Sequence, residues 1–596
     1  MIARAIWALL AFLAGFAAGP AAAQAERPNI VLILVDDAAL MDFGVYGGEA
    51  NTPNIDALAA SGAMFTQHRA TPFCAPSRAM LLTGMDNHTA GLGTIREVLP
   101  AEFRGQPGYT MALEPGVVTL AERLRASGYR TYMTGKWHLG HGPSELPIDH
   151  GFDRSFLVDA SGADNWKSQP YLPYYRTAPW FEDREPASLP DDFYSSTFLV
   201  DRMIDYLEED LARGEPFFVY LSFLAIHIPV QAPREYTEKY ADTYTEGWQA
   251  IRQARWERAQ ALGLISEGAA MAPAPATLGN WEWDALSRQE QAFAAKSMAV
   301  NAGMLEAMDY EIGRLIEYLK TTGAYENTIF LVTSDNGPEA GDPVNTVAAP
   351  WLCWEGYNWD IETLGERGSY VAIGPEWAQA ASGPNNLFKF HAGEGGLRVP
   401  LIFAGPGIPQ AERVNAFTVM TDVAPTLLEF AGTSGEAPDA VPDAVPMSGR
   451  SLRSLLTGDA ERIYGPDEAI GFETSGQAAL YRGDYKLVRN LPPHGDGVWR
   501  LYDLASDPGE TQDLADAQPQ LMREMLHEYR LYANRVGVLE LPKGYDPVEE
   551  ITRNVARKML EYYWGWLLAG MVVLAIGLGG IVYVIRAGIR RVAPRH

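Results

Sequence analysis

Polar side chains capable of acid–base and metal chemistry follow four short apolar runs in this sequence. Ligands of open α/β sheets bind outside the carboxyl ends of the strands, so residues that follow neighbouring strands can share one site. Taken singly, an Asp pair can cap a helix, Asp-Asn-Gly can form a turn, and a histidine can pack in a core. Together these residues predict one site if the strands are neighbours. The residues that follow the four runs are Asp36 and Asp37, Lys136 and His138, His227, and Asp335 and Asn336.

Four of these residues carry side-chain oxygens that suit a hard cation, namely Asp36, Asp37, Asp335 and Asn336. Calcium and magnesium take carboxylate and amide oxygens as ligands. Zinc sites instead use closely spaced Cys and His residues, and the sequence has no such cluster. The pattern therefore predicts a site for one divalent metal, calcium, with magnesium as the alternative.

Cys74 begins the motif Cys74-Ala75-Pro76-Ser77-Arg78. Pro76 fits the first turn of a helix that continues to Gly84. Cys74 would then lie at a helix N-terminus, which favours an anion, with Arg78 one turn later on the same face. This arrangement indicates a nucleophile held against an anionic substrate, although an ordinary reactive thiol also fits it. The only other cysteine is Cys353, and a disulfide between the two is the structural alternative.

Apolar runs that alternate with helical segments predict an α/β fold. The runs 29–35, 217–225, 328–333 and 399–403 are typical of strands buried on both faces, and another strand is expected near Tyr132, before Lys136 and His138. Helices are expected after Thr52, over 119–127, over 198–213 and over 291–320. This alternation favours a large, mostly parallel central sheet flanked by helices on both faces.

A stretch rich in Gly, Ala and Pro over 432–445 indicates a boundary to a smaller C-terminal α+β domain with an antiparallel sheet. Residues 479–488 are typical of a hairpin in that domain, and 518–536 of a helix. The expected division of the chain is a signal peptide (1–25), a catalytic domain (26–432), the small domain (433–545), a linker (546–561), a transmembrane helix (562–585) and a cytoplasmic tail (586–596).

Both ends of the chain carry signals for export and membrane attachment. Arg4, an apolar stretch over 6–18 and small residues over 21–25 are typical of a secretory signal peptide. Residues 564–585 are almost wholly apolar, and as a helix they would span about 33 Å, enough to cross a bilayer core. We therefore expect an exported protein on the periplasmic or other extracytoplasmic face, anchored by one C-terminal span.

The charge of the chain excludes one class of partner. With 596 residues and a formal net charge of −28, it lacks the basic surface that nucleic-acid binding requires. A local group of Arg, Lys and His can still bind a small anion within an acidic protein. We therefore expect a small anionic substrate and no nucleic acid.

Three motifs resemble the type I sulfatases, which depend on formylglycine and belong to the alkaline phosphatase-like superfamily. The first is Cys74-Ala75-Pro76-Ser77-Arg78 with Met80-Leu81-Leu82-Thr83-Gly84, and the second is Gly135-Lys136-Trp137-His138-Leu139-Gly140. The third is Leu501-Tyr502-Asp503-Leu504 with Asp507-Pro508-Gly509-Glu510. The stretches Gly368-Ser369-Tyr370-Val371 and Glu394-Gly395-Gly396-Leu397-Arg398-Val399-Pro400 are similar to bacterial arylsulfatases. The resemblance covers residues 27 to 530, and the C-terminal span departs from the soluble bacterial members.

The resemblance implies how such a site would work. A formylglycine-generating enzyme oxidises Cys74, and the aldehyde hydrates to a diol. One diol oxygen attacks sulfur, the alcohol leaves, and loss of a proton from the second hydroxyl expels sulfate. A plain serine would trap the sulfate because it has no second hydroxyl.

The resemblance also implies a role for each matched residue. Asp36, Asp37, Asp335, Asn336 and Cys74 hold the metal. Asp335 also takes a proton from the attacking hydroxyl, while Arg78 and Lys136 stabilise the diol. His138 is the base for sulfate release. His227 and Lys389 bind sulfate oxygens and assist the leaving group, and Lys136 also binds sulfate, with a core role for His227 as the alternative.

Other functions remain compatible with the same residues. A phosphonate or phosphate ester hydrolase of the superfamily would bind a tetrahedral anion in a similar site, and a catalytically inactive binding protein could keep the fold. Aromatic residues over 166–180 and 248–283 could line the mouth of the site for an aryl sulfate, or could pack an insertion. Long polymeric sulfated sugars fit this pattern less well.

Overall fold

A large sheet with both faces buried forms the centre of the protein. The computed structural model describes residues 27–592 except 211–212, 434 and 439–440. The sheet has the strand order β11-β2-β10-β9-β1-β8-β4-β5-β6-β7. Its strands are β1 (Asn29–Val35), β2 (Gly62–Phe65), β4 (Arg130–Lys136), β5 (Arg154–Val158), β6 (Trp180–Glu182), β7 (Glu185–Ala187), β8 (Phe217–Ser222), β9 (Thr328–Ser334), β10 (Leu401–Ala404) and β11 (Glu412–Val414). The expected α/β class is confirmed.

The middle of the sheet is parallel, and antiparallel pairs occur on both sides of it, although the edge strand β11 pairs in parallel with β2. β1 pairs in parallel with β8 and β9, and β4 pairs in parallel with β8 and β5. β10 runs antiparallel to β2 and β9, so the strand expected near Val399 reverses the sheet direction. The consecutive neighbours β9, β1, β8 and β4 place their carboxyl ends at one edge. This is the edge where ligands of such sheets bind.

Alternate side chains of β1 enter two separate cores. Val31, Ile33 and Val35 belong to one hydrophobic core, and Ile30, Leu32 and Leu34 to the other. Because successive strand residues point to opposite faces, both faces of the sheet must be covered. The helices of the catalytic body are α2 (Pro53–Ala60), α3 (Cys74–Thr83), α4 (Asn87–Ala90), α5 (Leu120–Ala126), α6 (Ser195–Asp210), α7 (Arg234–Thr237), α8 (Gly247–Ala261), α9 (Arg288–Thr321), α10 (Ala349–Trp354), α11 (Gly374–Ala381), α12 (Glu394–Leu397), α13 (Val423–Phe430) and α14 (Arg453–Leu456).

The expected helices form with small shifts at their ends. Thr119 caps α5 by accepting a hydrogen bond from the Glu122 amide, and Ser287 caps α9 in the same way. These capping boxes satisfy amide groups that have no partner within the helix. Helix α6 starts three residues before the expected Phe198. Strand β8 ends at Ser222, so the apolar residues that follow it are loop.

A four-stranded antiparallel sheet and a helix form the smaller C-terminal part. The sheet has the order β13 (Ala469–Thr474), β14 (Gln477–Arg482), β15 (Tyr485–Arg489) and β16 (Trp499–Asp503). The expected hairpin is β14–β15, and the expected helix is α15 (Pro519–Val536). Tyr529 and Met525 of α15 pack in one core with Leu487 of β15. A two-stranded sheet of β3 (His68–Arg69) and β12 (Thr418–Val419) completes the strands.

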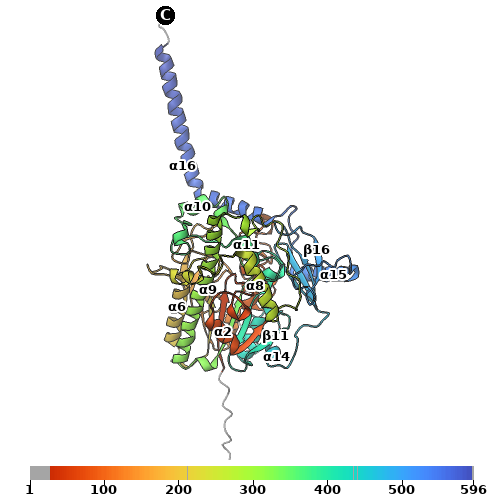
Figure 1. Ribbon diagram of the computed structural model, residues 1–596. Helices are drawn as coiled ribbons and strands as arrows, with labels where there is room; N and C mark the ends of the chain where they lie inside the picture. The colour runs from red at the N-terminus through yellow and green to blue at the C-terminus, as the bar shows by residue number, and fades with distance from the viewer. Residues whose placement is uncertain (1–26, 211–212, 434, 439–440, 593–596) are drawn as a thin grey trace, which may run out of the picture.

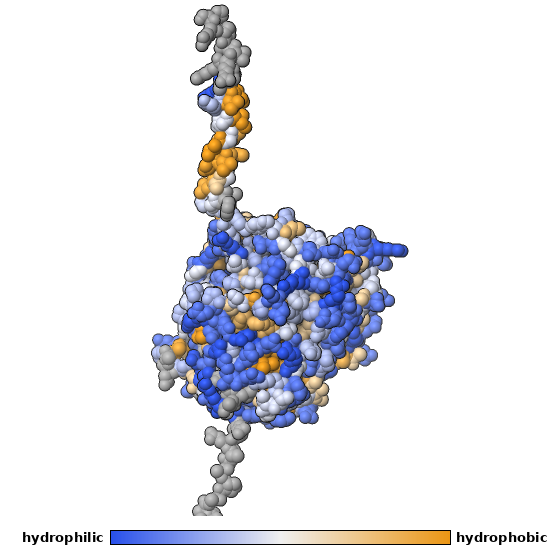
Figure 2. Space-filling model, turned by 90° about the vertical axis from the view of Figure 1, so that its left-hand side faces the viewer, coloured by the Kyte–Doolittle hydropathy of each residue, from blue (hydrophilic) through white to orange (hydrophobic). Residues whose placement is uncertain are grey.

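The last helix, α16 (Pro547–Val592), begins against the body, and its C-terminal part projects away from it (Figure 1). Its segment Leu568–Arg586 is long and apolar enough to cross a membrane, and it is unburied. Figure 2 shows this hydrophobic segment standing clear of the polar body. Most of the expected linker is helical and continuous with the apolar segment. The expected signal peptide and the last residues of the tail lie outside the described residues.

Candidate functional site

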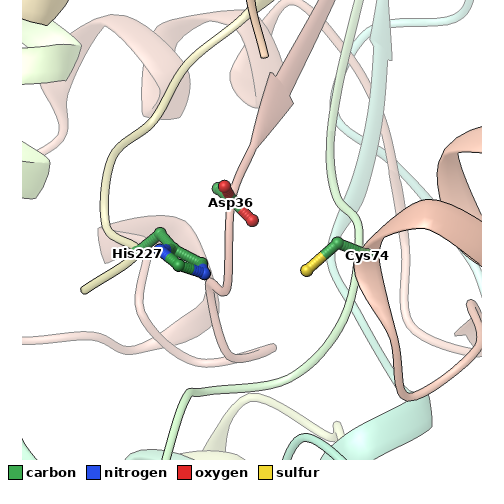
Figure 3. A group of neighbouring side chains, drawn as sticks. All are labelled: Asp36, Cys74 and His227. Atoms are coloured by element: carbon green, nitrogen blue, oxygen red, sulfur yellow. The ribbon is translucent and has the colours of Figure 1, made fainter. Parts of the chain in front are cut away.

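The carboxylates at the end of β1 gather against Cys74. Ligand atoms of Asp36, Asp37, Cys74 and Asp335 all lie within 4.8 Å of one another. Figure 3 shows Asp36 after its strand, Cys74 at the start of its helix and His227 on a loop, all facing one space. Successive residues of a strand point to opposite faces, but Asp37 has φ 71°, a left-handed conformation. The turn there allows two consecutive carboxylates to serve one site.

Cys74 is the first residue of α3, as the motif predicted. Its side chain is buried, and its Sγ lies 4.0 Å from Oδ1 of Asp37. Burial raises the pKa of the Cys74 thiol, although Lys136 and Lys389 act in the opposite direction. A buried thiol of high pKa is a poor nucleophile, which argues against the ordinary reactive thiol. Both Cys74 and the exposed Cys353 are free, so the structure does not contain the alternative disulfide.

Arg78 holds three elements around the site. Its Nε and Nη2 lie 2.8 and 2.7 Å from Oδ2 of Asp335, and its Nη1 donates to the Lys136 carbonyl and to Ser222 Oγ. Burial alone would lower the pKa of Arg78, but Asp335 and Asp36 raise it. The guanidinium is therefore a fixed cation whose planar fork sets the position of Asp335.

Two buried lysines neutralise the aspartates of β1. Lys136 Nζ donates to Oδ2 of Asp36 at 2.6 Å, and Lys389 Nζ lies 2.7 Å from Oδ1 of Asp37. Lys389 also contacts Glu339 at 2.8 Å. Burial would lower the pKa of Lys389, but Asp37 and its other anionic neighbours raise it well above the usual value. Both cations are placed to meet an anionic substrate.

The oxygen atoms of the cluster fit a hard cation. Oδ1 of Asp36 and Oδ1 of Asn336 are buried and have no hydrogen-bond partner among the described residues, although the Asp36 oxygen lies 3.4 Å from Nη2 of Arg78. Asn336 donates its Nδ2 to Oδ1 of Asp37 at 2.7 Å, which leaves its own oxygen free to bind a metal. Burial raises the pKa of Asp37 to about 6 and also raises that of Asp335. Unpaired buried oxygens and destabilised carboxylates are both relieved by a divalent metal.

The two histidines are buried in neutral form beside the cluster. Burial, reinforced by Lys136, lowers the pKa of both His138 and His227 well below the usual value. His227 Nδ1 lies 2.6 Å from the Ile228 carbonyl, and its Nε2 lies 3.9 Å from Asp37. Neither ring nitrogen of His138 has a hydrogen-bond partner in the part of the chain that the structure describes, and its backbone is left-handed, with φ 61°. A neutral imidazole without a partner can accept a proton.

The loop that carries Lys389 is supported by the C-terminal sheet. Glu394 of α12 accepts hydrogen bonds from Arg69 at 2.7 Å and from Lys486 of β15 at 2.9 Å. Lys486 also contacts Glu510, whose carboxylate accepts the Glu394 amide. Burial would raise the pKa of Glu394, but Arg69 and Lys486 lower it. The C-terminal motif that ends at Glu510 therefore orders this loop without touching the cluster.

Close backbone packing joins the same loop to the turn of Asp335 and Asn336, the predicted metal ligands. A Cβ at Gly337 would lie 1.8 Å from the Gly395 carbonyl. Glycine thus allows the Asp335–Asn336 turn to rest directly on α12.

The two aromatic stretches have different places. In the second, Trp248 and Trp283 pack edge to face with ring centroids 4.7 Å apart, within the core. In the first, Tyr171 packs edge to face on His227 at 5.1 Å, and Tyr174 and Tyr175 line a pocket that also contains His138. Only the first stretch therefore contributes to the surroundings of the site.

The structure brings together every residue that the sequence predicted for this site. Ser222 and Glu339 were not predicted from the sequence, and Tyr174 and Tyr175 were expected only as part of the aromatic stretch 166–180. Glu339 lies three residues after Asn336 and could have been found as one more carboxylate beyond the same strand. Ser222 ends β8 but stands within an apolar run, where a serine gives little signal. The tyrosines come from a segment that has no regular pattern.

Comparison with known proteins gives one consistent family. A sequence model described as Sulfatase matches residues 28–433. An uncharacterized sulfatase of Schizosaccharomyces pombe is 34% identical over 88% of this chain and 96% of its own length. An arylsulfatase of Klebsiella aerogenes is 36% identical over 74% of this chain and 94% of its own. The crystal structure of Ps i-CgsB in complex with k-i-k-neocarrahexaose has the same fold, with a TM-score of 0.60 and 22% identity over 85% of this chain and 93% of the other.

Proposed function

Because the chain belongs to the sulfatase family and is a sulfuric ester hydrolase, we propose that it cleaves aryl sulfates with Cys74 converted to formylglycine. The observation that carries this proposal is the position of Cys74. It lies at a helix N-terminus, against three carboxylates and within the influence of two buried lysines. An oxidised side chain there would meet the metal and the sulfate ester together.

A divalent metal would be held by Asp36, Asp37, Asp335, Asn336 and the modified side chain of residue 74. Calcium is our first choice, and magnesium is the alternative. When bound, a divalent metal supplies a Lewis acid that lowers the pKa of a coordinated hydroxyl and neutralises sulfate charge.

The protein side chains then divide the remaining tasks. Lys136 and Lys389 turn from the aspartates toward the sulfate oxygens, and His227 binds the same group. Asp335 accepts the proton of the attacking hydroxyl, while Arg78 keeps that carboxylate in place. His138, neutral and without a partner, accepts the proton whose loss releases sulfate.

We also propose that the enzyme is exported and anchored by α16. The apolar segment Leu568–Arg586 supports a single span, and the N-terminal sequence supports export. The catalytic body would then lie on the extracytoplasmic side, the periplasm in a bacterial cell.

Mass spectrometry tests this proposal. The full chain is co-expressed with a formylglycine-generating enzyme, and the tryptic peptide containing residue 74 is weighed. Conversion makes the peptide about 18 Da lighter than its cysteine form. Converted protein should release phenol and sulfate from phenyl sulfate. An unmodified thiol despite a competent enzyme overturns the nucleophile, and faster cleavage of phenyl phosphonate esters would favour the related phosphonate hydrolases. Converted protein that is inert toward both would be a binding protein.

A further inference from the structure

The helix that leads into the apolar segment also forms part of the pocket beside the catalytic cluster. This pocket, of about 100 Å³, is bordered by His138 and Tyr175 from the body and by Lys558 and Tyr562 from α16. Ser161 of the same pocket contacts the Tyr171 hydroxyl at 2.8 Å, and Tyr171 packs on His227 of the cluster, so the pocket lies next to the proposed reacting groups. The part of a substrate that lies beyond its sulfate would therefore contact α16.

The first turns of α16 are fixed to the body. Asn554 is 1% exposed, and its Nδ2 donates to the carbonyls of Glu97 and Leu99 at 2.9 and 3.2 Å. Arg104 donates to the Asn554 oxygen at 2.8 Å. Tyr562 donates its hydroxyl to the Tyr174 carbonyl at 2.9 Å. These contacts fix the distance between the pocket and the membrane that the apolar segment of α16 would enter.

That distance is short. Tyr562 precedes Leu568, where the apolar segment starts, by six residues, which is about 9 Å along a helix. The headgroup layer on each side of a bilayer is roughly 5–8 Å thick. If Leu568 enters the hydrocarbon core, the pocket opens at the outer edge of the headgroups.

The pocket suits an amphiphilic anion. Tyr174, Tyr175 and Tyr562 provide apolar ring surface, and Arg96 and Lys558 provide positive charge. The pocket also contains Asp159, which pairs with His141, and Lys558 contacts Glu561 at 2.8 Å. Positive charge attracts a sulfate at the membrane surface, and the rings can pack against the carbon atoms next to it.

Resting on the proposed sulfatase activity and membrane span, we propose that the substrates are amphiphilic sulfate esters whose apolar part stays in the bilayer. In this arrangement α16 is both the anchor and one wall of the substrate pocket. Lys558 and Tyr562 determine specificity and take no part in the chemical step.

The distance of the pocket from the membrane is tested with the full-length enzyme, with Cys74 converted to formylglycine, in phosphatidylcholine vesicles. The two probes are hexadecyl sulfate held in the bilayer and phenyl sulfate dissolved in water. A flexible 12-residue Gly-Ser insertion after Gly565 keeps the pocket wall but allows a separation of about 19 Å. We expect kcat/KM to fall at least tenfold for hexadecyl sulfate and to stay within twofold for phenyl sulfate. The matched control appends the same residues after His596.

The wall is tested with Lys558→Ala and Tyr562→Ala, and with Arg553→Ala on the exposed face of the same helix as the control. We expect each wall variant to raise KM for hexadecyl sulfate about fivefold to tenfold with kcat within twofold, and the control to match the wild type. Wild-type values for the insertion and for both wall variants would overturn this inference alone. Failure of the converted wild type on both probes would instead overturn the sulfatase proposal.

Discussion

Arg78 and Asp335 form a fully buried pair in which two guanidinium nitrogens contact one carboxylate oxygen, at 2.8 and 2.7 Å. The pair joins the first turns of α3 to the end of β9, which are 257 residues apart in the chain. It leaves the second oxygen of Asp335 available to the cluster, where it accepts the Asp37 amide at 3.2 Å.

Replacing Arg78 with lysine should lower kcat without removing the positive charge. Lysine cannot reproduce the fork, so Asp335 loses its fixed position and Ser222 loses its donor. We expect kcat for phenyl sulfate to fall by about 10²–10³-fold, as on loss of a preorganised charge-stabilising donor. Conversion of Cys74 must be measured in the same samples by peptide mass, since Arg78 belongs to the recognised motif. Near wild-type kcat in fully converted Arg78→Lys protein would contradict the assignment.

Replacing Cys74 with serine should stop turnover after one event. A serine hydroxyl in the same place can attack the sulfur atom and accept the sulfuryl group as phenol leaves. The serine side chain then has no second hydroxyl to expel sulfate. We expect at most one phenol per enzyme molecule, and a protein that gains the mass of one sulfuryl group. Cys353→Ser is the matched control, because Cys353 is exposed, and it should retain full turnover. Sustained multiple turnover by Cys74→Ser would contradict the formylglycine mechanism.

Removing the amide oxygen of Asn336 should weaken metal binding. This oxygen is buried and has no hydrogen-bond partner, which suits a metal ligand. We expect Asn336→Ala to raise the Kd for calcium by roughly 10–100-fold, the range measured when support for a bound metal is lost. Competition with a calcium-sensitive dye measures this, and chelation should abolish phenyl sulfate hydrolysis in the wild type. Asn345→Ala, at an exposed position on the following loop, should bind calcium normally.

The contact between His88 and Glu473 should make stability depend on pH. His88 Nε2 lies 2.8 Å from Oε2 of Glu473, and both side chains are buried. Burial would lower the pKa of His88, but Glu473 raises it above the usual value. Protonated His88 therefore stabilises the fold below its unfolded pKa of about 6.5, and this contribution is lost as the pH rises through the folded pKa.

Thermal unfolding of His88→Gln compared with wild type measures that contribution. We expect a loss of about 1–3 kcal/mol at acidic pH that shrinks as the pH rises. His527→Gln, at an exposed position of α15, should unfold like the wild type at every pH. A difference that grows toward alkaline pH would show that the neutral histidine is the stabilising form.

Local patterns in the sequence were enough to predict the α/β class, the central strands and the longest helices. Buried strands need continuous apolar residues, and helix ends need capping groups, so β1, β9, α5 and α9 can be recognised from their own residues. The polar residues at the strand ends were visible for the same reason, because charge that interrupts an apolar run is conspicuous. The orientation of β10 was not predictable, since antiparallel pairing depends on partners far along the chain.

The sequence by itself determined which residues have side chains suited to catalysis or metal binding. They are the cysteine motif at a helix start and the acids, lysines and histidines that follow the strands. Only the tertiary structure decided that β9, β1, β8 and β4 are consecutive neighbours, which is what gathers those residues into one buried cluster. It also brought Glu339 to Lys389, Glu510 to the Glu394 amide, and Tyr562 of the last helix to the pocket of His138. These contacts join segments distant in the chain, and their strength comes from shared burial, where each charge must find a partner. The need to pair a buried charge arises only in the folded protein, so it produces no periodic pattern in the sequence.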